Sequence, residues 1–394
     1  MSRELFSRND DLKRLRDEGY FVEVRGTFLV MREVPYVSAQ KEVCTGTLIS
    51  SLNIVGVEVR LPDDHKIYFD GDFPHRADGT PIQSIEHQTN KTMSLGHGLT
   101  ARHVFSSKPD GMDYVDYYQK MTNYANVLSG PAAVLRPDVT PRVYRSLEDE
   151  EEESVFSYME TASDRVGIGA LTERLAADQI AIVGVGGTGS YILDLAAKTP
   201  VREIRLFDPD EFLQHNAFRA PGAPSLEELR EAPKKVEYLK GIYERMHRGI
   251  TAHPVALGAR NINLLDGVTF AFLCLDAGEA KRHIVEKLEA IGASFVDVGM
   301  GLELEEGTLG GILRVTASTP EKRDHVHQGK ISFAGGGADD LYSSNIQVAD
   351  LNALNATLAV VKWKKIRGFY RDLEREHHST YTTDGNMIVN GDLA

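Results

Sequence analysis

The spacing of apolar and polar residues divides the chain into two parts. In the first part, apolar residues alternate with polar ones, and Gly, Pro and Asp interrupt the runs. Such alternation is typical of a meander of half-buried strands. Helical spacing at 11–20 and 113–130 adds a short helix before the strands and a longer one after them. We therefore predict a small α+β domain whose strands lie in 20–37, 45–54, 55–62 and 65–74.

In the second part, short and continuously apolar runs alternate with helical stretches. Runs of this kind are typical of strands buried on both faces, and the alternation predicts a Rossmann-like, doubly wound, mostly parallel α/β sheet. We expect helices at 189–198, 234–247, 280–292 and 350–378. The predicted strands are QIAIVGV (179–185), EIRLFD (203–208), TFAFLCLD (269–276), SFVDVGM (294–300) and GGILRVT (310–316).

The boundary is predicted at an unbroken acidic run, 148–153, because like charges repel and favour a solvated linker. This gives an N-terminal domain (1–147), a second domain (154–378) and a C-terminal tail (379–394), which we read as a last strand or a protein-binding extension.

Composition narrows the class of protein. The formal charge of −14 argues against a nucleic-acid partner, and no apolar run is long enough for a membrane span. The start of the chain is too polar for a secretory signal, so we expect a cytoplasmic protein. Its two cysteines, Cys44 and Cys274, provide neither a disulfide framework nor a four-cysteine zinc site.

A glycine-rich turn follows the first strand of the second part. GVGGTG places Gly184, Gly186, Gly187 and Gly189 between a buried strand and a helix. Glycines let the backbone turn tightly and approach phosphate, and the helix N-terminus offers free N–H groups. Asp208 ends the next strand, where an acidic side chain can bind ribose hydroxyls. This much would suit NAD as well as ATP.

Three features favour a triphosphate. The segment DPDEFLQHNAFR (208–219) contains Asp210 and ends with Asn216 and Arg219, whose guanidinium can bridge phosphate oxygens. Lys234 and Lys235 begin a helix and can fold back toward a phosphate. Asp276 follows a buried strand at the binding edge of the sheet, where a carboxylate can hold Mg²⁺.

As an ordered set, these motifs resemble the ThiF/E1-like adenylating family over residues 160–370. GVGGTG is similar to the family's GxGGxG, DPD to its DxD, and NAFR to its NLxR, with Ala217 in place of Leu. Lys235 is most similar to the family lysine, and Asp276 with Arg282 to its Asp followed by Arg. The first part resembles an uncharacterised domain found ahead of bacterial E1-like modules.

The resemblance implies a set of roles. The four glycines and Asp208 would hold ATP, while Asn216, Arg219 and Lys235 would position the triphosphate and Asp276 would bind Mg²⁺. The implied reaction is adenylation of the C-terminal carboxylate of a ubiquitin-like protein by a homodimer. The implied partner is an E2-like conjugating enzyme, and antiviral defence is the implied setting.

The sequence departs from the ubiquitin-activating relatives in the crossover segment, where they carry a cysteine. ASTPEKRDHVHQGKISFAGGGADDLYSSNIQ (317–347) has none. Either the enzyme only adenylates, or a hydroxyl accepts the acyl group. The candidates are Ser343 and Ser344, with Ser332 and Tyr342 behind them. Asp339, Asp340, His325 and His327 are the nearby bases.

Other functions remain open. The runner-up is adenylation of a sulfur carrier, as in thiamin or molybdopterin biosynthesis, or of a tRNA carboxylate. A scaffold that keeps the nucleotide fold to dock partners is a third reading, and an NAD(P) oxidoreductase a fourth.

Overall fold

The structure is a computed structural model of the 394-residue chain. It describes residues 5–6, 8–56, 58–145, 154–158, 160–165, 168–276, 278–333 and 346–393. The chain forms two compact units. Unit 1 comprises 1–153 and 158–173, and unit 2 comprises 154–157 and 174–394. Residues 158–173, which the sequence analysis placed in the second domain, thus cluster with unit 1.

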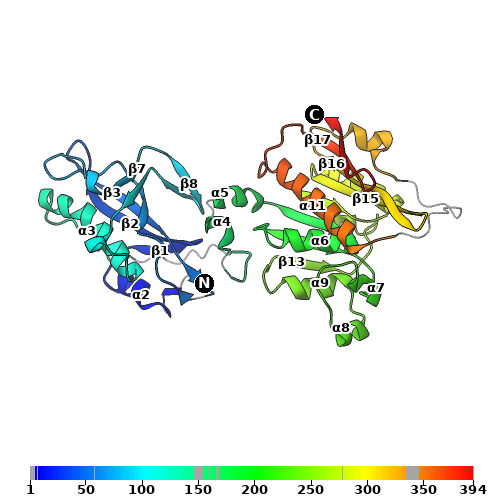
Figure 1. The fold of residues 1–394 in the computed structure, drawn as a ribbon, viewed down its shortest axis with the longest axis horizontal. Helices are drawn as coiled ribbons and strands as arrows, with labels where there is room; N and C mark the ends of the chain where they lie inside the picture. Colours follow the sequence, from blue (N-terminus) through cyan, green and yellow to red (C-terminus); the bar gives the residue numbers. More distant parts are fainter. Residues whose placement is uncertain are drawn as a thin grey trace. The chain divides into compact units, whose positions relative to one another are not determined.

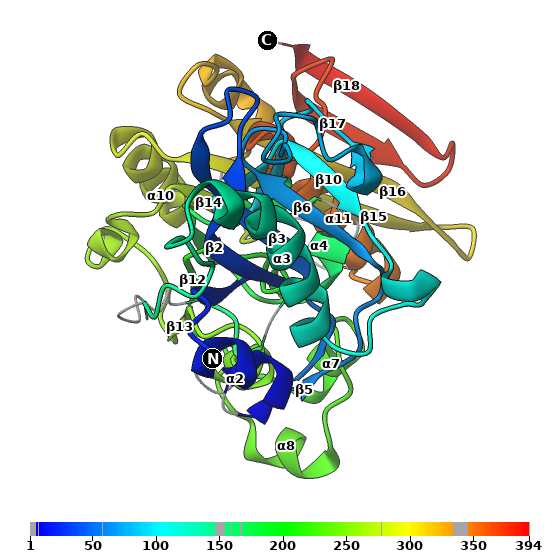
Figure 2. The same cartoon turned by 90° about the vertical axis from the view of Figure 1, so that its left-hand side faces the viewer.

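Unit 1 is built on a six-stranded antiparallel sheet in the order β1-β2-β3-β6-β10-β7. Helix α3 (Tyr117–Leu135) packs against β2 and β3, as Figure 2 shows, and α2 (Asp10–Asp17) contacts α3. Leu29, Met31, Phe69 and Tyr124 are fully or nearly fully buried between them. The strands are β1 (Val22–Arg25), β2 (Phe28–Val37), β3 (Val43–Ser51), β6 (Lys66–Asp70), β7 (Glu86–Gln88) and β10 (His103–Ser106).

Unit 2, which Figure 1 draws from green to red, contains an eight-stranded sheet in the order β13-β12-β11-β14-β15-β16-β17-β18. The pairings from β13 to β15 are parallel, and those from β15 to β18 are antiparallel. This confirms the predicted doubly wound, mostly parallel fold. The strands are β11 (Gln179–Val183), β12 (Glu203–Phe207), β13 (Ile250–His253), β14 (Phe270–Leu273), β15 (Ser294–Glu305), β16 (Thr308–Ser318), β17 (Glu376–Thr382) and β18 (Met387–Leu393).

Helices cover both faces of the parallel strands. Helices α6 (Gly187–Ala196), α9 (Lys235–Tyr243) and α11 (Ala349–Ile366) share one apolar core with the sheet, and Trp363 is fully buried in it. Helix α10 (Glu279–Ala290) packs on the opposite face through a second core. Strands covered on both sides need apolar residues at every position, which is why the sequence shows continuous rather than alternating runs.

The helix predicted at 350–378 ends earlier than expected, and the tail forms strands, which is one of the two readings that the sequence left open. Helix α11 stops at Ile366, and Gly368 then adopts a positive φ of 69°. Residues 376–393 form β17 and β18, which extend the sheet. Lys362 and Lys365 at the end of α11 pair with Asp372 and Glu376 at 2.9–3.7 Å. These ion pairs fasten the returning strand to the helix, which apolar spacing alone does not reveal.

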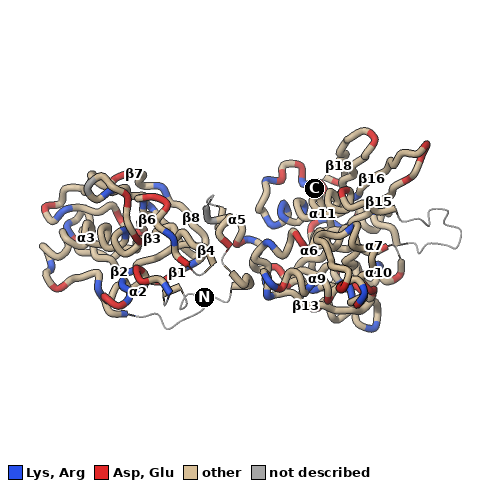
Figure 3. Tube along the Cα trace, turned by 60° about the horizontal axis from the view of Figure 1, so that its bottom comes forward, with Lys and Arg blue, Asp and Glu red and all other residues tan. Residues whose placement is uncertain are grey.

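Basic and acidic residues are interspersed along both units (Figure 3). In the part of the chain that the structure describes, no helix has the length and apolarity to cross a bilayer.

Two glycines in unit 2 give a matched test of this packing. A Cβ on Gly189 would lie 1.9 Å from the Gly184 carbonyl oxygen, whereas one on Gly241, inside α9, would meet nothing within 4 Å. We expect Gly189→Ala to destabilise unit 2 by about 1–3 kcal/mol or more through overpacking. Gly241→Ala should stabilise it by about 0.5–1 kcal/mol through helix propensity. Urea unfolding followed by Trp363, the single tryptophan, measures both; equal effects would contradict the packing.

The fully buried His247 gives unit 2 a pH dependence. Its Nε2 lies 2.9 Å from the Val201 carbonyl oxygen, and its Nδ1 accepts from the Gly249 N–H, so the ring is neutral. Burial lowers the pKa of His247 below its ordinary 6.5. Below about pH 6.5, His247 is protonated in the unfolded chain but stays neutral in the folded chain. The free energy of unfolding therefore falls as the pH drops. His247→Gln should flatten this loss between pH 6.5 and 5 relative to wild type in urea titrations. An unchanged slope would show that His247 does not contribute.

Candidate functional site

The glycine-rich turn joins β11 to α6. Gly184 has a φ of 85°, and a Cβ there would lie 2.6 Å from the Cys274 carbonyl oxygen. A Cβ on Gly187 would overlap the Asn352 amide, and a Cβ on Gly189 would overlap the Gly184 carbonyl oxygen. A Cβ on Gly186, by contrast, would meet nothing within 4 Å. Three of the glycines are thus required by packing, and the space over Gly186 is where a ligand can approach the backbone.

Asp208 holds this turn in place. It follows β12 and is only 6% exposed. Its Oδ2 accepts the Val185 N–H of the turn at 2.9 Å, and its Oδ1 accepts the Asp210 N–H at 3.0 Å. A buried carboxylate with two backbone donors is a stable arrangement. Asp208 therefore shapes the backbone, in addition to the ribose contact expected from the sequence.

Lys235 lies next to this carboxylate at the start of α9. It is 7% exposed, and its Nζ lies 2.7 Å from Asp210 Oδ2 and 3.6 Å from Asp208 Oδ1. Its neighbour Lys234 instead donates from Nζ to the Pro209 carbonyl oxygen. The structure thus distinguishes the two lysines, and only Lys235 faces the aspartates of the site.

Asn216 and Arg219 present buried donors without acceptors. The Asn216 side-chain oxygen accepts the Leu213 N–H at 2.9 Å, but its Nδ2 is buried and has no hydrogen-bond partner. The Nε of Arg219 is also buried without one. Since buried donors normally find partners, two orphans on one short segment indicate a place for a ligand with several acceptor oxygens.

Asp276 and Arg282 lie on the same carboxyl edge of the sheet. Among the interactions described, neither contacts the glycine turn, the aspartates or the donors of the site. Asp276 is exposed and follows β14, which pairs with β11; the Cys274 N–H donates to the Val183 carbonyl oxygen. Arg282 is exposed on α10, with its Cζ 5.1 Å from the centroid of the Phe333 ring. Their roles stay predictions.

Of the acyl-acceptor candidates, Ser343, Ser344 and Tyr342 lie outside the described residues, as do Asp339 and Asp340. Ser332 is exposed. Of the candidate bases, His325 is fully buried, with Nε2 2.7 Å from the Ala317 carbonyl oxygen, and His327 pairs with Glu289.

The two cysteines are both free. Burial raises the pKa of the Cys274 thiol well above its ordinary value, which opposes thiolate formation. Cys44 packs against the core of unit 1.

Two features escaped the sequence analysis. Asn352, fully buried on α11, contacts both the glycine turn and the Arg219 segment. Asp297 on β15, also fully buried, pairs with Lys281 at 2.7 Å and Arg314 at 2.5 Å. The available signal was polar residues inside apolar patterns: Asn352 and Asn355 are three apart in a helical run, and Asp297 interrupts an apolar strand.

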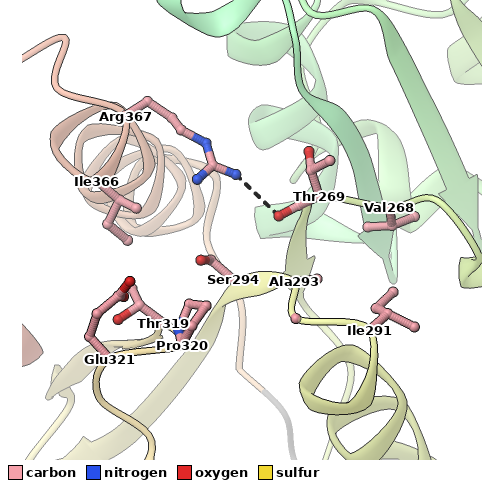
Figure 4. Close-up of a pocket in the computed structure, with 11 residues that line it drawn as sticks. Val268, Thr269, Ile291, Ala293, Ser294, Thr319, Pro320, Glu321, Ile366 and Arg367 are labelled. Atoms are coloured by element: carbon pink, nitrogen blue, oxygen red, sulfur yellow. Dashed lines mark hydrogen bonds between the residues drawn. The ribbon is translucent and has the colours of Figure 1, made fainter.

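A pocket of about 400 Å³ lies at the opposite, amino edge of the sheet (Figure 4). Thr269, Ser294, Thr319, Glu321 and Arg367 supply its polar lining. Arg367 is already committed, because it donates to the Asp178 carboxylate and to the Thr269 carbonyl oxygen. The arginine of this pocket is therefore already paired, unlike the donors at the carboxyl edge.

A parallel sheet with a glycine turn, an acid on the next strand and unpaired donors at its carboxyl edge is typical of nucleotide-binding α/β domains. Residues 161–318, most of which lie in unit 2, match the ThiF family. Residues 10–161 match a domain of unknown function, DUF6791.

Solved structures show weak similarity to the chain. The crystal structure of E. coli MccB with ATP is 14% identical, covering 60% of this chain and 72% of that one with a TM-score of 0.45. Selenomethionine-labelled PaaA is 16% identical, covering 58% and 77% with a TM-score of 0.40. TcdA (CsdL) is 16% identical, covering 52% and 92% with a TM-score of 0.38. No curated protein matches the chain.

The two aspartates of the DPD segment should differ under the same substitution. Asp208→Asn would place an amide donor against one of two backbone N–H groups, at a cost of about 1–3 kcal/mol. Asp210→Asn should cost less than about 1 kcal/mol, because the Asp210 side chain is 64% exposed and its ion pair with Lys235 is screened. Urea unfolding of both variants measures the difference. A larger cost for Asp210→Asn would contradict the assignment of Asp208 as the residue that holds the turn.

Proposed function

We propose that the protein is an ATP-dependent activating enzyme that adenylates the C-terminal carboxylate of a ubiquitin-like protein. The observation that carries this proposal is the pair of buried, unpartnered donors, Asn216 Nδ2 and Arg219 Nε, within a ThiF-family domain. Lys235 adds a cation beside the glycine turn. Together they suit a ligand rich in negatively charged oxygens, as a triphosphate is.

The residues present fit ATP and Mg²⁺. The opening at Gly186 and the N-terminus of α6 suit phosphate, and Asp208 at the end of β12 suits a ribose. Among the described residues no cluster of three or more His, Cys, Asp or Glu side chains could hold a metal. One or two carboxylates and substrate phosphates commonly hold Mg²⁺, and Asp276 is the carboxylate we assign to it.

In the proposed reaction, a substrate carboxylate oxygen attacks the α-phosphorus of ATP. The bond from that phosphorus to the bridging oxygen breaks, giving an acyl-adenylate and pyrophosphate. Asn216 and Arg219 would donate to phosphate oxygens, and Lys235 would exchange Asp210 for the triphosphate. Mg²⁺, when bound, would offset charge on the leaving pyrophosphate. The chain mainly orients two anions and stabilises charge that is already present.

Further steps form part of the proposal. The hydroxyl of Ser343 or Ser344 would attack the acyl carbonyl of the adenylate, giving an oxyester and AMP while its proton passes to a nearby base, or an E2-like enzyme would take the acyl group directly with release of AMP. Unit 1 would recruit the ubiquitin-like protein or that enzyme, and the active form would be a homodimer in the cytoplasm. A bacterial conjugation system, with antiviral defence as its setting, is the proposed context.

The test is exchange of labelled pyrophosphate into ATP in the presence of a candidate ubiquitin-like protein. We expect exchange that requires a free C-terminal carboxylate on that protein. Arg219→Ala should reduce its rate by about 10²–10³-fold, the usual effect of losing one positioned donor at a developing charge. Asp276→Asn should reduce it by removing the proposed Mg²⁺ ligand.

The matched control is Asp266→Asn. Asp266 precedes β14 as Asp276 follows it, and its pair with Lys287 lies at the other end of that strand. Exchange should persist in this variant. ATP binding without exchange for any carrier would leave a nucleotide-binding scaffold, and exchange with a carrier whose C-terminus is blocked would exclude a carboxylate substrate.

A further inference from the structure

Asn352 lies in the first turn of α11, the helix that follows the crossover segment. It is fully buried, in a helix that otherwise buries mainly apolar and small residues against the sheet. A buried side-chain amide is costly unless its polar atoms are paired, so its contacts reveal what it is for.

Those contacts join two segments that the chain places far apart. Thr188 of the glycine turn donates from Oγ1 to Asn352 Oδ1 at 3.0 Å. Asn352 Nδ2 in turn donates to the Arg219 carbonyl oxygen at 3.3 Å. The same amide fills the space beside Gly187, where a Cβ would lie 2.2 Å from Nδ2. One side chain therefore bridges the phosphate turn and the residue proposed to bind phosphate.

We propose that Asn352 is a positioning residue that sets the backbone of Arg219 relative to the glycine turn. The inference rests on the proposed function, because it assigns Asn352 a role in holding the phosphate groups of ATP. The side-chain amide supplies the acceptor and the donor that the two contacts need, whereas a carboxylate lacks the donor and an alkyl chain lacks both. Glutamine would extend one methylene further into the space beside Gly187.

The chain supplies a matched control one turn along the same helix. Asn355 is also fully buried, and its Nδ2 donates to the Gly299 carbonyl oxygen in β15 at 3.1 Å. It has no contact with the glycine turn or with Arg219 among the interactions described. Asn352→Ala and Asn355→Ala thus remove the same group from the same helix, and only the first removes the bridge.

The experiment measures the dissociation constants of ATP and adenosine by calorimetry on the full chain, with unfolding measured in parallel. Asn352→Ala should weaken ATP about tenfold or more, which corresponds to roughly one net hydrogen bond at a positioned group. The dissociation constant of adenosine, which lacks phosphates, should change much less than that of ATP. Asn355→Ala should leave the ratio of the two constants at its wild-type value while still lowering stability.

A second variant covers a failure of Asn352→Ala to fold. Thr188→Val removes one hydrogen bond of the bridge from the other side and keeps the shape of the side chain. Thr199→Val is its control, because Thr199 donates to the Ala196 carbonyl oxygen at the far end of α6. Thr188→Val should weaken ATP selectively, and combining it with Asn352→Ala should add little, as expected when both substitutions break one interaction.

The outcomes separate this inference from the proposed function. Wild-type protein that does not bind ATP would overturn both. ATP binding by the wild type, with equal losses of ATP and adenosine affinity in Asn352→Ala, would overturn the positioning role alone. So would fully additive effects of Thr188→Val and Asn352→Ala, or an equal change in Asn355→Ala.

Discussion

The site depends on one buried carboxylate, that of Asp208. Its two oxygens accept backbone N–H groups from the turn after β11 and from its own strand end, and Lys235 lies within 3.6 Å. The turn contains four glycines, which tolerate many backbone conformations, so something outside it must select one. Asp208 provides that selection across the pairing of β11 and β12. It lets the helix N-terminus and the open side of Gly186 face the same edge of the sheet.

At this edge of the sheet, the charged side chains form ion pairs that a bound polyanion can replace. Lys235 is neutralised by Asp210, whose side chain is mostly exposed, so the ion pair is weak and a polyanion can compete for the lysine. Asn216 and Arg219 keep buried donors unpaired, which costs free energy until an acceptor arrives. Both features favour binding of a ligand with several acceptor oxygens, because that ligand gains ionic and hydrogen-bond partners that the protein does not already use. The pocket at the amino edge differs in this respect, because its arginine, Arg367, already donates to the Asp178 carboxylate.

The antiparallel half of the sheet has a different basis. β16, β17 and β18 continue the sheet beyond the parallel strands, and ion pairs between α11 and residues 372–376 secure the return. Asn352 and Asn355 link the same helix to the glycine turn and to β15. Helix α11 thus connects the added strands to the nucleotide edge. Unit 1 has a separate core and a separate sheet.

The sequence by itself determined the local elements and the chemistry of the site. Continuous apolar runs predicted the buried strands β11, β12, β14, β15 and β16, but not the short edge strand β13. A glycine turn followed by Asp208, Arg219 and Lys235 predicted an anion site, because these signals depend on neighbours along the chain. The sequence left the tail (379–394) open between a last strand and a protein-binding extension, and it extended the preceding helix to residue 378. Ion pairs and strand partners, rather than local spacing, hold β17 and β18 in the sheet. The sequence did not reveal that Lys235, not Lys234, faces the aspartates, or that Asn352 bridges to Arg219. Those outcomes depend on contacts between residues over a hundred positions apart or on the direction of one side chain. Only the tertiary structure decides them.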